Sequence, residues 1–565
     1  MRDDFRVRVL GCAVAALVII GSGIIGAMLA AKLAKTGASV LMLEAGPNIP
    51  RGEIVARFRN SPRRSDWMSP YPSVDSAPHP IYRPEDNHHL VQAGPYPYKA
   101  EYMRMVGGTS WHWAAHAWRN VPGDFKIKSL YGVGVDWPFD YDELEPYYQE
   151  AEAIMGVGGS TATGSPRSQP FPMGEVAIPY AMQRVRDRLA GTFDVVNNTV
   201  ARNSRTFDGR PPCCGNNSCQ PICPIDAQYH GGIAVQQALA VGVKMTYLAN
   251  VFQLEHDAQG RIVAANYYDP DKNVHRVAGK TFIVAANGIE SPRLLLLSKS
   301  EKFKQGIAND NDMVGRHLMD HPSTSLTFDA DEDVWLGRGP QSPVSINAMR
   351  DGDFRGEYSP YRLDFTNISR VDGATNSLLK AGIYGKEFAE KLRHASAREM
   401  NVKSVLEVLP DPERRIDLAD EKDAMGLQKP RAHYSIDDYT FKGHKRAQKD
   451  FAKIAQLMGG TNLRYTKDDD FANNQHICGT LSMGTDSAVS VCDEFGRAWN
   501  HANLYFASTG VLPTSSTCNS TLNGIAVALR TGAHLIAENG GAAMLPRSNT
   551  LATWKRLNPL WKPAA

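Results

Sequence analysis

The chain has 565 residues, of which 42% are hydrophobic and 22% charged, and its 62 basic and 60 acidic residues give a formal net charge of +2. This length allows two or more domains around a large core, and the near-neutral charge gives no basis for nucleic-acid binding. Eight cysteines are too few to staple a chain of this size with disulfides. Four of the eight nevertheless lie between residues 213 and 223, so their clustering needs its own explanation.

The first motif lies inside an uncharged run, Val9 to Ala31, which by length could span a membrane or serve as a signal peptide. Within it, Gly21, Gly23 and Gly26 form GxGxxG directly after an apolar strand and open an Ala-rich helix; a second strand ends at Glu44. This complete βαβ unit favours dinucleotide binding. The glycines serve the tight turn, the approach of the pyrophosphate and helix–strand packing, while Glu44 binds ribose hydroxyls.

The remaining elements follow in chain order and predict an α/β protein. We expect irregular structure over 47–100, an amphipathic helix over 141–155, a hairpin over 244–279, a strand–turn–helix over 281–298, and a strand from 503 leading to a helix near Ser520. The predicted domains are a nucleotide-binding part (13–322), a mainly substrate-binding part (323–470), a return to the first domain (471–539) and a loosely attached tail (540–565).

Four separated blocks carry a family resemblance: GSGIIG with Glu44, VGGTSWHWAA (106–115), NNQHICGTLSMG (473–484) and NLYFASTGVLPTSSTCNSTLNGIAVAL (503–529). Together they resemble the glucose–methanol–choline oxidoreductases, which use FAD. The resemblance implies a Rossmann-like FAD-binding domain and a β-sheet-based substrate domain. A fifth block, residues 201–232, resembles one branch, the flavoprotein subunits of bacterial membrane-bound glucose, fructose, sorbitol and gluconate dehydrogenases.

The cysteine loop CCGNNSCQPIC lies in that fifth block. Closely spaced thiolates can wrap an iron–sulfur cluster, and the branch carries a three-iron (3Fe–4S) cluster. The resemblance implies Cys213, Cys219 and Cys223 as its ligands, with Cys214 doubtful because adjacent side chains seldom face the same cluster. From the residues alone, a four-cysteine zinc site or two disulfides remain alternatives.

The resemblance also implies the catalytic pair. His476, in NNQHICG, is the expected base for a hydroxyl proton, because a neutral imidazole has a pKa near working pH. Asn519, in TCNSTL, is expected to bind the reacting hydroxyl. Cys478 and Cys518 are interpreted as small core residues, with substrate shaping by Cys478 as an alternative. His317 and His321, in MVGRHLMDHP, suggest either a metal site or support of the domain junction.

Further contacts with FAD are expected from backbone-rich segments near the motifs. His112 could be attached covalently to the flavin or lie beside it between Trp111 and Trp113, and the second alternative is favoured. The other expected contacts are Gly107, Gly108, Thr109, Ala286, Asn287, Gly288, Ser508, Thr509, Gly510, Thr521 and Leu522.

The resemblance implies partners as well. A cluster beside FAD would pass single electrons to a multihaem cytochrome c subunit, which would hold the assembly at the periplasmic face of the inner membrane. A small chaperone-like subunit would carry the export signal, since the first strand of this chain leaves no room for one. The predicted activity is oxidation of a sugar, sugar alcohol or sugar acid. Alternatives are a flavin oxidase that reduces oxygen and a non-catalytic redox sensor. An NAD-dependent enzyme is disfavoured because the one nucleotide motif already serves FAD.

Overall fold

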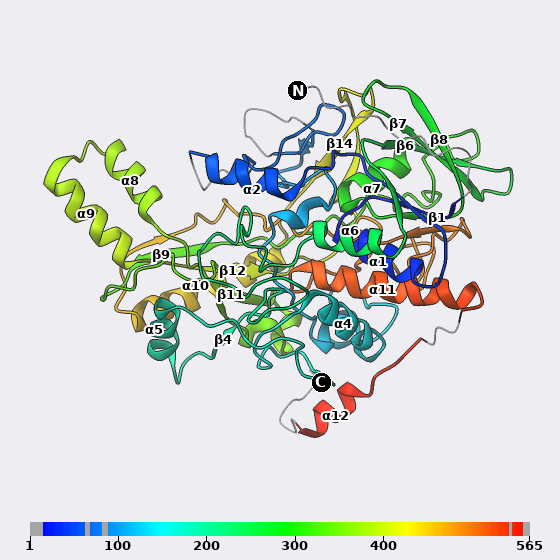
Figure 1. The fold of residues 1–565 in the computed structure, drawn as a ribbon. Helices are drawn as coiled ribbons and strands as arrows, with labels where there is room; N and C mark the ends of the chain where they lie inside the picture. Colours follow the sequence, from blue (N-terminus) through cyan, green and yellow to red (C-terminus); the bar gives the residue numbers. More distant parts are fainter. Residues whose placement is uncertain (1–14, 63–67, 82–88, 542–544, 558–565) are drawn as a thin grey trace.

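The computed structural model describes residues 15–62, 68–81, 89–541 and 545–557 (Figure 1). Within these ranges no helix is long and apolar enough to cross a membrane. The part of the run Val9 to Ala31 that is described, from residue 15, folds as a buried strand and the helix after it. Residues 1–12, which received no structural assignment, lie outside the described part.

The first sheet has seven strands and contains the βαβ unit. Its order is β5 (Lys244–Thr246), β2 (Val40–Leu43), β1 (Ala15–Ile20), β8 (Val274–Val284), β7 (Ile262–Tyr268) and β6 (Asn250–His256), with β16 (Leu504–Phe506) also on β8. The long strand β8 joins two systems, because its last residues pair in parallel with β1 and β16 while its first residues continue the antiparallel β6–β7 hairpin. The predicted hairpin and strand–turn–helix are therefore confirmed.

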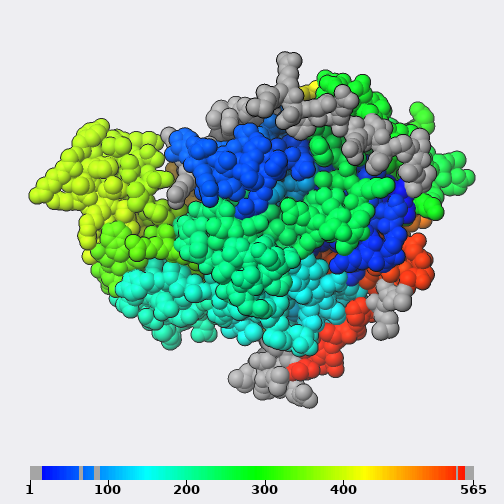
Figure 2. Space-filling view, viewed as in Figure 1, coloured from blue at the N-terminus to red at the C-terminus, as the bar shows by residue number. Residues whose placement is uncertain are grey.

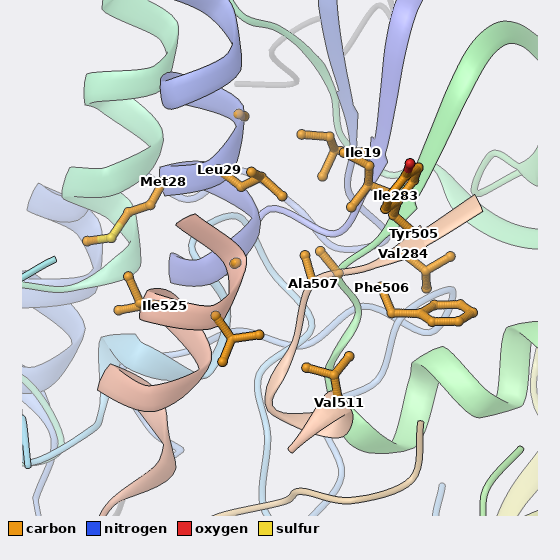
Figure 3. Packing of buried hydrophobic residues seen from close by; sticks show 14 of the residues in the cluster. Ile19, Met28, Leu29, Ile283, Val284, Tyr505, Phe506, Ala507, Val511 and Ile525 are labelled. Atoms are coloured by element: carbon orange, nitrogen blue, oxygen red, sulfur yellow. The ribbon is translucent and has the colours of Figure 1, made fainter. Parts of the chain in front are cut away.

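The largest core lies between this sheet and the helices on it (Figure 3). Leu29 of α1 (Ile24–Ala34) points toward Ile19 and Ile283 of the sheet, whereas Met28 points to the other side of α1, where Ile525 of α11 (Ser520–Glu538) lies. Other helices of this region are α4 (Tyr141–Met155), α6 (Gly231–Ala240) and α7 (Asn287–Leu297). The predictions of α4 and of a helix from Ser520 are confirmed.

The second sheet has six strands, in the order β15 (Thr461–Tyr465), β9 (Ser325–Asp329), β12 (Glu399–Leu406), β11 (Tyr361–Phe365), β10 (Val344–Ile346) and β4 (Val195–Asn197). Strand alternation divides its faces. Leu363, Phe365 and Val402 face a core shared with α5 (Tyr180–Leu189) and α10 (Asp438–Leu457), whereas Arg362 and Asp364 line a cavity. This sheet takes β4 from well before residue 323.

A third sheet of three strands, β13 (Arg415–Lys422), β14 (Gln428–His433) and β3 (Val91–Ala93), shares a small core with α7 through Ile416, Ala432 and Ile289. Beyond the second sheet, helices α8 (Val371–Lys380) and α9 (Gly385–Arg398) project from the body (Figures 1 and 2). Short 3-10 turns lie at Gly108–Trp111, Pro122–Phe125, Ala348–Arg350, Asp353–Gly356 and Thr509–Val511, and a short helix, α3, at Ile127–Tyr131.

Two predictions from composition were wrong in part. The stretch expected to be irregular contains α2 (Arg51–Asn60), whose Ile54 and Phe58 are buried. The tail is not loose throughout, because it includes α12 (Thr550–Leu557) and is held on α4. There the Asp142 carboxylate accepts hydrogen bonds from the Ser548 hydroxyl (2.9 Å) and the Leu551 amide (3.0 Å).

Candidate active site

A cavity of about 550 Å³ lies between the first and second sheets. Three helices begin at its wall, since Gly23 and Ile24 of α1, Asn287 of α7, and Ser520 and Thr521 of α11 all line it. Helix N-termini present free amide groups and a partial positive charge. This wall therefore suits an anionic dinucleotide.

The three glycines of GxGxxG are required for three different reasons. Gly21 has φ +109°, and a Cβ there would lie 2.5 Å from the Ala285 carbonyl oxygen. A Cβ at Gly26 would lie 2.6 Å from the Gly21 carbonyl oxygen, so this glycine allows the helix to approach the strand. A Cβ at Gly23 would meet no protein atom within 4 Å. Because Gly23 lines the cavity, the space it leaves is available to a pyrophosphate.

Glu44 also lines the cavity at the end of β2. Its carboxylate accepts hydrogen bonds from the Ser22 amide (3.0 Å), the Ser22 hydroxyl (2.7 Å) and the Gly46 amide (3.0 Å). Burial raises the pKa of this carboxyl group, while these hydrogen bonds oppose the rise. The Ser22 bonds join Glu44 to the glycine turn, at the edge where a ribose would lie.

The GGTSW block crosses the cavity wall. Gly108, Thr109 and His112 line it, whereas Gly107 (φ +89°) packs against the backbone at Gly232. His112 does not lie between two tryptophans as the sequence suggested. Its ring lies 6.2 Å from that of Tyr71, while Trp111 stacks on His230. Burial lowers the pKa of His112 to about 4, so the ring is neutral.

The other expected FAD contacts divide in the same way. Ala286, Asn287, Ser508, Thr509 and Thr521 line the cavity. Gly288, Gly510 and Leu522 are not part of its wall: Gly288 packs against Ile477 and Thr480, Gly510 lies behind it, and the Leu522 side chain is in the large core. These three residues support the wall from behind.

The predicted catalytic pair meets at the second-sheet side of the cavity. The Asn519 amide nitrogen lies 2.7 Å from His476 Nε2, and both residues line the cavity. On the opposite edge of the ring, His476 Nδ1 lies 2.9 Å from Nδ1 of His321. His321 Nε2 is 3.1 and 3.0 Å from the carbonyl oxygens of Ser515 and Ser516.

These contacts determine the tautomers, because carbonyl oxygens only accept hydrogen bonds. His321 therefore carries its proton at Nε2 and accepts at Nδ1. His476 must then donate from Nδ1, which leaves the lone pair on Nε2. The Asn519 orientation is determined as well, since Arg362 Nη2 donates to its Oδ1 at 3.0 Å and leaves its NH₂ toward His476. Asp320, His321 and His476 lie close enough to form a metal-binding group, but hydrogen bonds use Nδ1 of both histidines and Nε2 of His321.

Burial keeps the histidine pair neutral. Desolvation, together with the neighbouring His321, Arg362 and Lys403, holds the pKa of His476 well below its ordinary value. Burial likewise lowers the pKa of His321 to about 4. Behind the pair, the Asp320 carboxylate accepts the amides of His476 (3.0 Å) and Gln475 (3.1 Å) and so holds their loop. A neutral imidazole with an available lone pair can accept a proton from an alcohol.

The wall opposite the nucleotide side comes from the second sheet. Arg362 donates to both carboxylate oxygens of Asp364, at 2.8 and 2.9 Å, and to the Thr517 carbonyl at 2.9 Å. Lys403 lies directly opposite Asp364 across the β11–β12 pair. Its Nζ donates to Asn474 Oδ1 at 3.1 Å. Neither Arg362 nor Lys403 was identified from the sequence, although the alternation in YRLDFT was a signal that could have shown which side chains share a face.

The cysteine loop reaches the same cavity through Cys219, which is buried and part of its wall. Burial raises the pKa of Cys213 and of Cys223, and the neighbouring cysteines of the loop add to this rise. Cys214 is exposed. The nearby backbone amides of Ile225, Ala227 and Gln228 oppose the rise in the pKa of Cys223. Amide groups near cysteine sulfurs suit an iron–sulfur cluster.

The remaining cysteines of the described part also have free thiols. Cys478 is fully buried beside Met319 and does not line the cavity, in agreement with its interpretation as a core residue. Cys518 is buried where its thiol contacts the Arg119 carbonyl and Arg350. His317 lies apart from the catalytic pair, near Ser482.

Comparison with known proteins identifies the family. A family model described as GMC oxidoreductase matches residues 410–528, and one described as an NAD(P)-binding Rossmann-like domain matches residues 19–54. The fructose dehydrogenase large subunit of Gluconobacter japonicus is 44% identical over 528 residues, covering 91% of this chain and 96% of that protein. The chain belongs to the GMC oxidoreductase family.

More distant relatives extend the same picture. The 2-methyl-1,2-propanediol dehydrogenase of Mycolicibacterium austroafricanum is 26% identical, with coverage of 92% of this chain and 94% of that protein. Among solved structures, pyridoxine 4-oxidase from Mesorbium loti has a TM-score of 0.64 at 17% identity, covering 92% and 99% of the two chains, which shows a common fold. The chain is thus a GMC flavoprotein oxidoreductase with the predicted mixed α/β fold.

Proposed function

We propose that this protein oxidises a hydroxyl group of a sugar, sugar alcohol or sugar acid and passes the electrons, one at a time, through a three-iron cluster to a cytochrome c subunit. One observation carries the proposal. The cavity is lined both by the His476–Asn519 pair and by Cys219 of the cysteine loop. A base for alcohol oxidation and a ligand for an electron carrier therefore border one space.

The residues of the pair have complementary tasks. A substrate hydroxyl between them would donate its proton to His476 Nε2 and accept from the Asn519 amide. When bound, FAD supplies the acceptor for the hydride from the carbon that carries this hydroxyl, so that the alcohol becomes a carbonyl. As His476 takes the proton, its Nδ1–H bond to His321 becomes charge-assisted and stabilises the imidazolium.

Cys213, Cys219 and Cys223 would hold the cluster, and Cys214 is left out of the ligand set. When bound, such a cluster supplies a one-electron carrier. A zinc site would want four ligands in paired-cysteine spacing, usually from two loops, and CCGNNSCQPIC does not have that spacing. A flavin oxidase that reduces oxygen needs no such loop, which is why it is the second candidate.

The partner subunits and the location belong to the same proposal. The similar Gluconobacter japonicus protein is named as a large subunit, which supports an assembly with further subunits. We propose a small chaperone-like subunit that carries the export signal and a multihaem cytochrome c that holds the complex at the periplasmic face of the inner membrane. The chain itself would then need no direct contact with the membrane.

An anaerobic titration of the purified holoprotein tests the activity. D-glucose, D-fructose, D-sorbitol, D-gluconate and 2-keto-D-gluconate are added in turn while the flavin absorbance is followed. At least one should bleach the flavin, and His476→Ala should retain FAD and lose the bleaching. If dithionite bleaches the flavin and none of the five compounds does, the proposal is wrong.

Iron analysis tests the electron path. Cys219→Ser should lose iron and the transfer of electrons to a cytochrome c, while substrate still bleaches the flavin. The matched control is Cys214→Ser, which should keep the wild-type iron content because its thiol is exposed and outside the group of three. Rapid peroxide formation in air by the iron-containing protein would favour the oxidase.

A further inference from the structure

The wall of the cavity around the catalytic pair carries more positive than negative charge. Three cations, Arg202, Arg362 and Lys403, contribute to lowering the pKa of the neighbouring His116, after burial, and one carboxylate, Asp364, opposes them. All four line the cavity. Glu44 and Glu290 also line it, but Glu44 accepts hydrogen bonds from Ser22 and Gly46 at the glycine turn, and Glu290 is paired with His89 and Arg293.

The single carboxylate is already neutralised. Asp364 accepts two parallel hydrogen bonds from Arg362, an arrangement that uses both of its oxygens. Arg362 is 1% exposed, and its other bonds go to the Thr517 carbonyl and Asn519. This arginine therefore holds Asn519 in place and has a counter-charge of its own.

Lys403 has no direct ion pair in the described part of the chain, and Asp364 acts on it only from the opposite position across the strand pair. Its Nζ donates to the neutral amide oxygen of Asn474 at 3.1 Å, and in the described part of the chain it makes no ion pair with a carboxylate within 4.0 Å. An ammonium group has three donors, so two are left for a molecule in the cavity. Desolvation lowers the pKa of Lys403, which is the cost of holding this charge away from water.

Lys403 also lies at the reacting end of the cavity. Asn474 joins it to the catalytic pair, because the Asn474 amide donates to the backbone oxygen of His321 at 2.6 Å. Lys403 is moreover one of the charges that lower the pKa of His476. A substrate group bound to Lys403 would therefore be separated by only a few covalent bonds of the substrate from the hydroxyl that His476 deprotonates.

We infer that the substrate is a sugar acid, whose carboxylate binds Lys403 while a nearby hydroxyl lies between His476 and Asn519. This inference rests on the proposed function and narrows it. A carboxylate would supply the counter-charge that the wall lacks, and its bond to an ammonium is charge-assisted. A neutral sugar could also accept a hydrogen bond from Lys403, but the part-buried ammonium group would stay without a direct ion pair.

The test compares acids with neutral sugars in the holoprotein. Flavin reduction is measured anaerobically with D-gluconate and 2-keto-D-gluconate, and with D-glucose, D-fructose and D-sorbitol. We expect an acid to have the highest kcat/KM. Lys403→Met should lower that value by roughly 10- to 100-fold, as expected for the loss of a hydrogen bond between charged groups, and mainly by raising KM. Lys403→Arg, which retains the charge, should recover most of the loss.

Two controls separate binding from structure. Lys386→Met in α9, where the side chain is 91% exposed, should leave flavin reduction unchanged. In Lys403→Met the acid limb of the pH–rate profile should move to higher pH, because a charge that lowers the pKa of His476 is gone. A mere packing defect would not produce this shift.

The outcomes are distinguishable. If a neutral sugar reduces the flavin with a higher kcat/KM than either acid, or if Lys403→Met affects acids and neutral sugars equally, the inference is overturned and the proposed function stands. If none of the five compounds reduces the flavin, the proposed function itself fails.

Discussion

The bond between His321 and His476 offers the sharpest test of the proton-accepting site. His321→Phe keeps a planar ring of similar size and removes the Nδ1 acceptor that lies 2.9 Å from His476 Nδ1. The Nδ1–H of His476 is then left without its partner in a buried site, and the proton is free to move to Nε2 instead. In that tautomer Nε2 has no lone pair for the substrate hydroxyl.

The magnitude follows from the charge that develops on His476. A hydrogen bond to a charged group contributes about 1.5–3 kcal/mol, and each 1.36 kcal/mol corresponds to tenfold in rate. Flavin reduction should therefore slow by roughly 10- to 150-fold. The bonds from His321 to the Ser515 and Ser516 carbonyls lie on the far side of the ring. Their loss should mainly lower the free energy of unfolding.

The assay is anaerobic stopped-flow reduction with saturating substrate, which isolates the chemical step from reoxidation. FAD content and thermal midpoint serve as checks that the variant is folded. His321→Gln is a useful companion, because its amide oxygen can again accept from His476 and should restore part of the rate. A His321→Phe variant that reduces its flavin within threefold of the wild-type rate would refute the relay and leave His321 a packing residue.

Two further predictions concern cofactor binding and acid stability. Gly23→Val should lose FAD but keep a near-native thermal midpoint as the apoprotein, because its side chain would enter only the space left for the pyrophosphate. Gly26→Val should have a lower thermal midpoint, because its Cβ would lie 2.6 Å from a backbone oxygen. Equal loss of stability in both variants would contradict these roles of the two glycines. Several buried histidines have pKa values lowered to about 4, so the unfolded chain binds protons first as the pH falls below 6.5, and stability present above that pH is lost toward pH 4. These histidines are His79, His89, His112, His116, His317 and His321. Each lowers the free energy of unfolding by about 1.4 kcal/mol at pH 5.5, so the thermal midpoint should fall by several degrees between pH 7.5 and 5.5. An unchanged midpoint would show that these histidines are not held neutral by burial.

Features that depend on a short stretch of chain could be predicted from the sequence. The GxGxxG turn needs its glycines for reasons confined to neighbouring backbone atoms, and its strand and helix follow at once. The N-cap of helix α4 is Asp140, whose side chain accepts a hydrogen bond from the Glu143 amide in a capping box. This motif can be recognised from the spacing of the two acidic residues. The tail was misjudged because its composition gives no sign of the acceptor on Asp142, far away in the chain.

The active site divides along the same line. The block NNQHICG indicates His476 by resemblance, but the residue that orients its ring lies 155 positions earlier. In the sequence, His321 is one of two histidines in MVGRHLMDHP, and nothing local distinguishes it from His317, which has no part in the pair. Its role arises only when the loop before β9 meets the loop after β15, where His476 lies.

The same argument applies with more force to the substrate wall. Arg362 and Lys403 become neighbours only through the register of β11 and β12, which sets Asp364 opposite Lys403. The alternation within one strand can be read from its own sequence. The strand pairing that places both Arg362 and Lys403 beside Asp364 cannot be read in this way. A one-residue slip of β12 would turn Lys403 into the core and bring its neighbours Val402 and Ser404 to the cavity side. Family motifs therefore predict the chemistry of this enzyme, whereas the proposed preference for a sugar acid depends on a strand register that no motif contains.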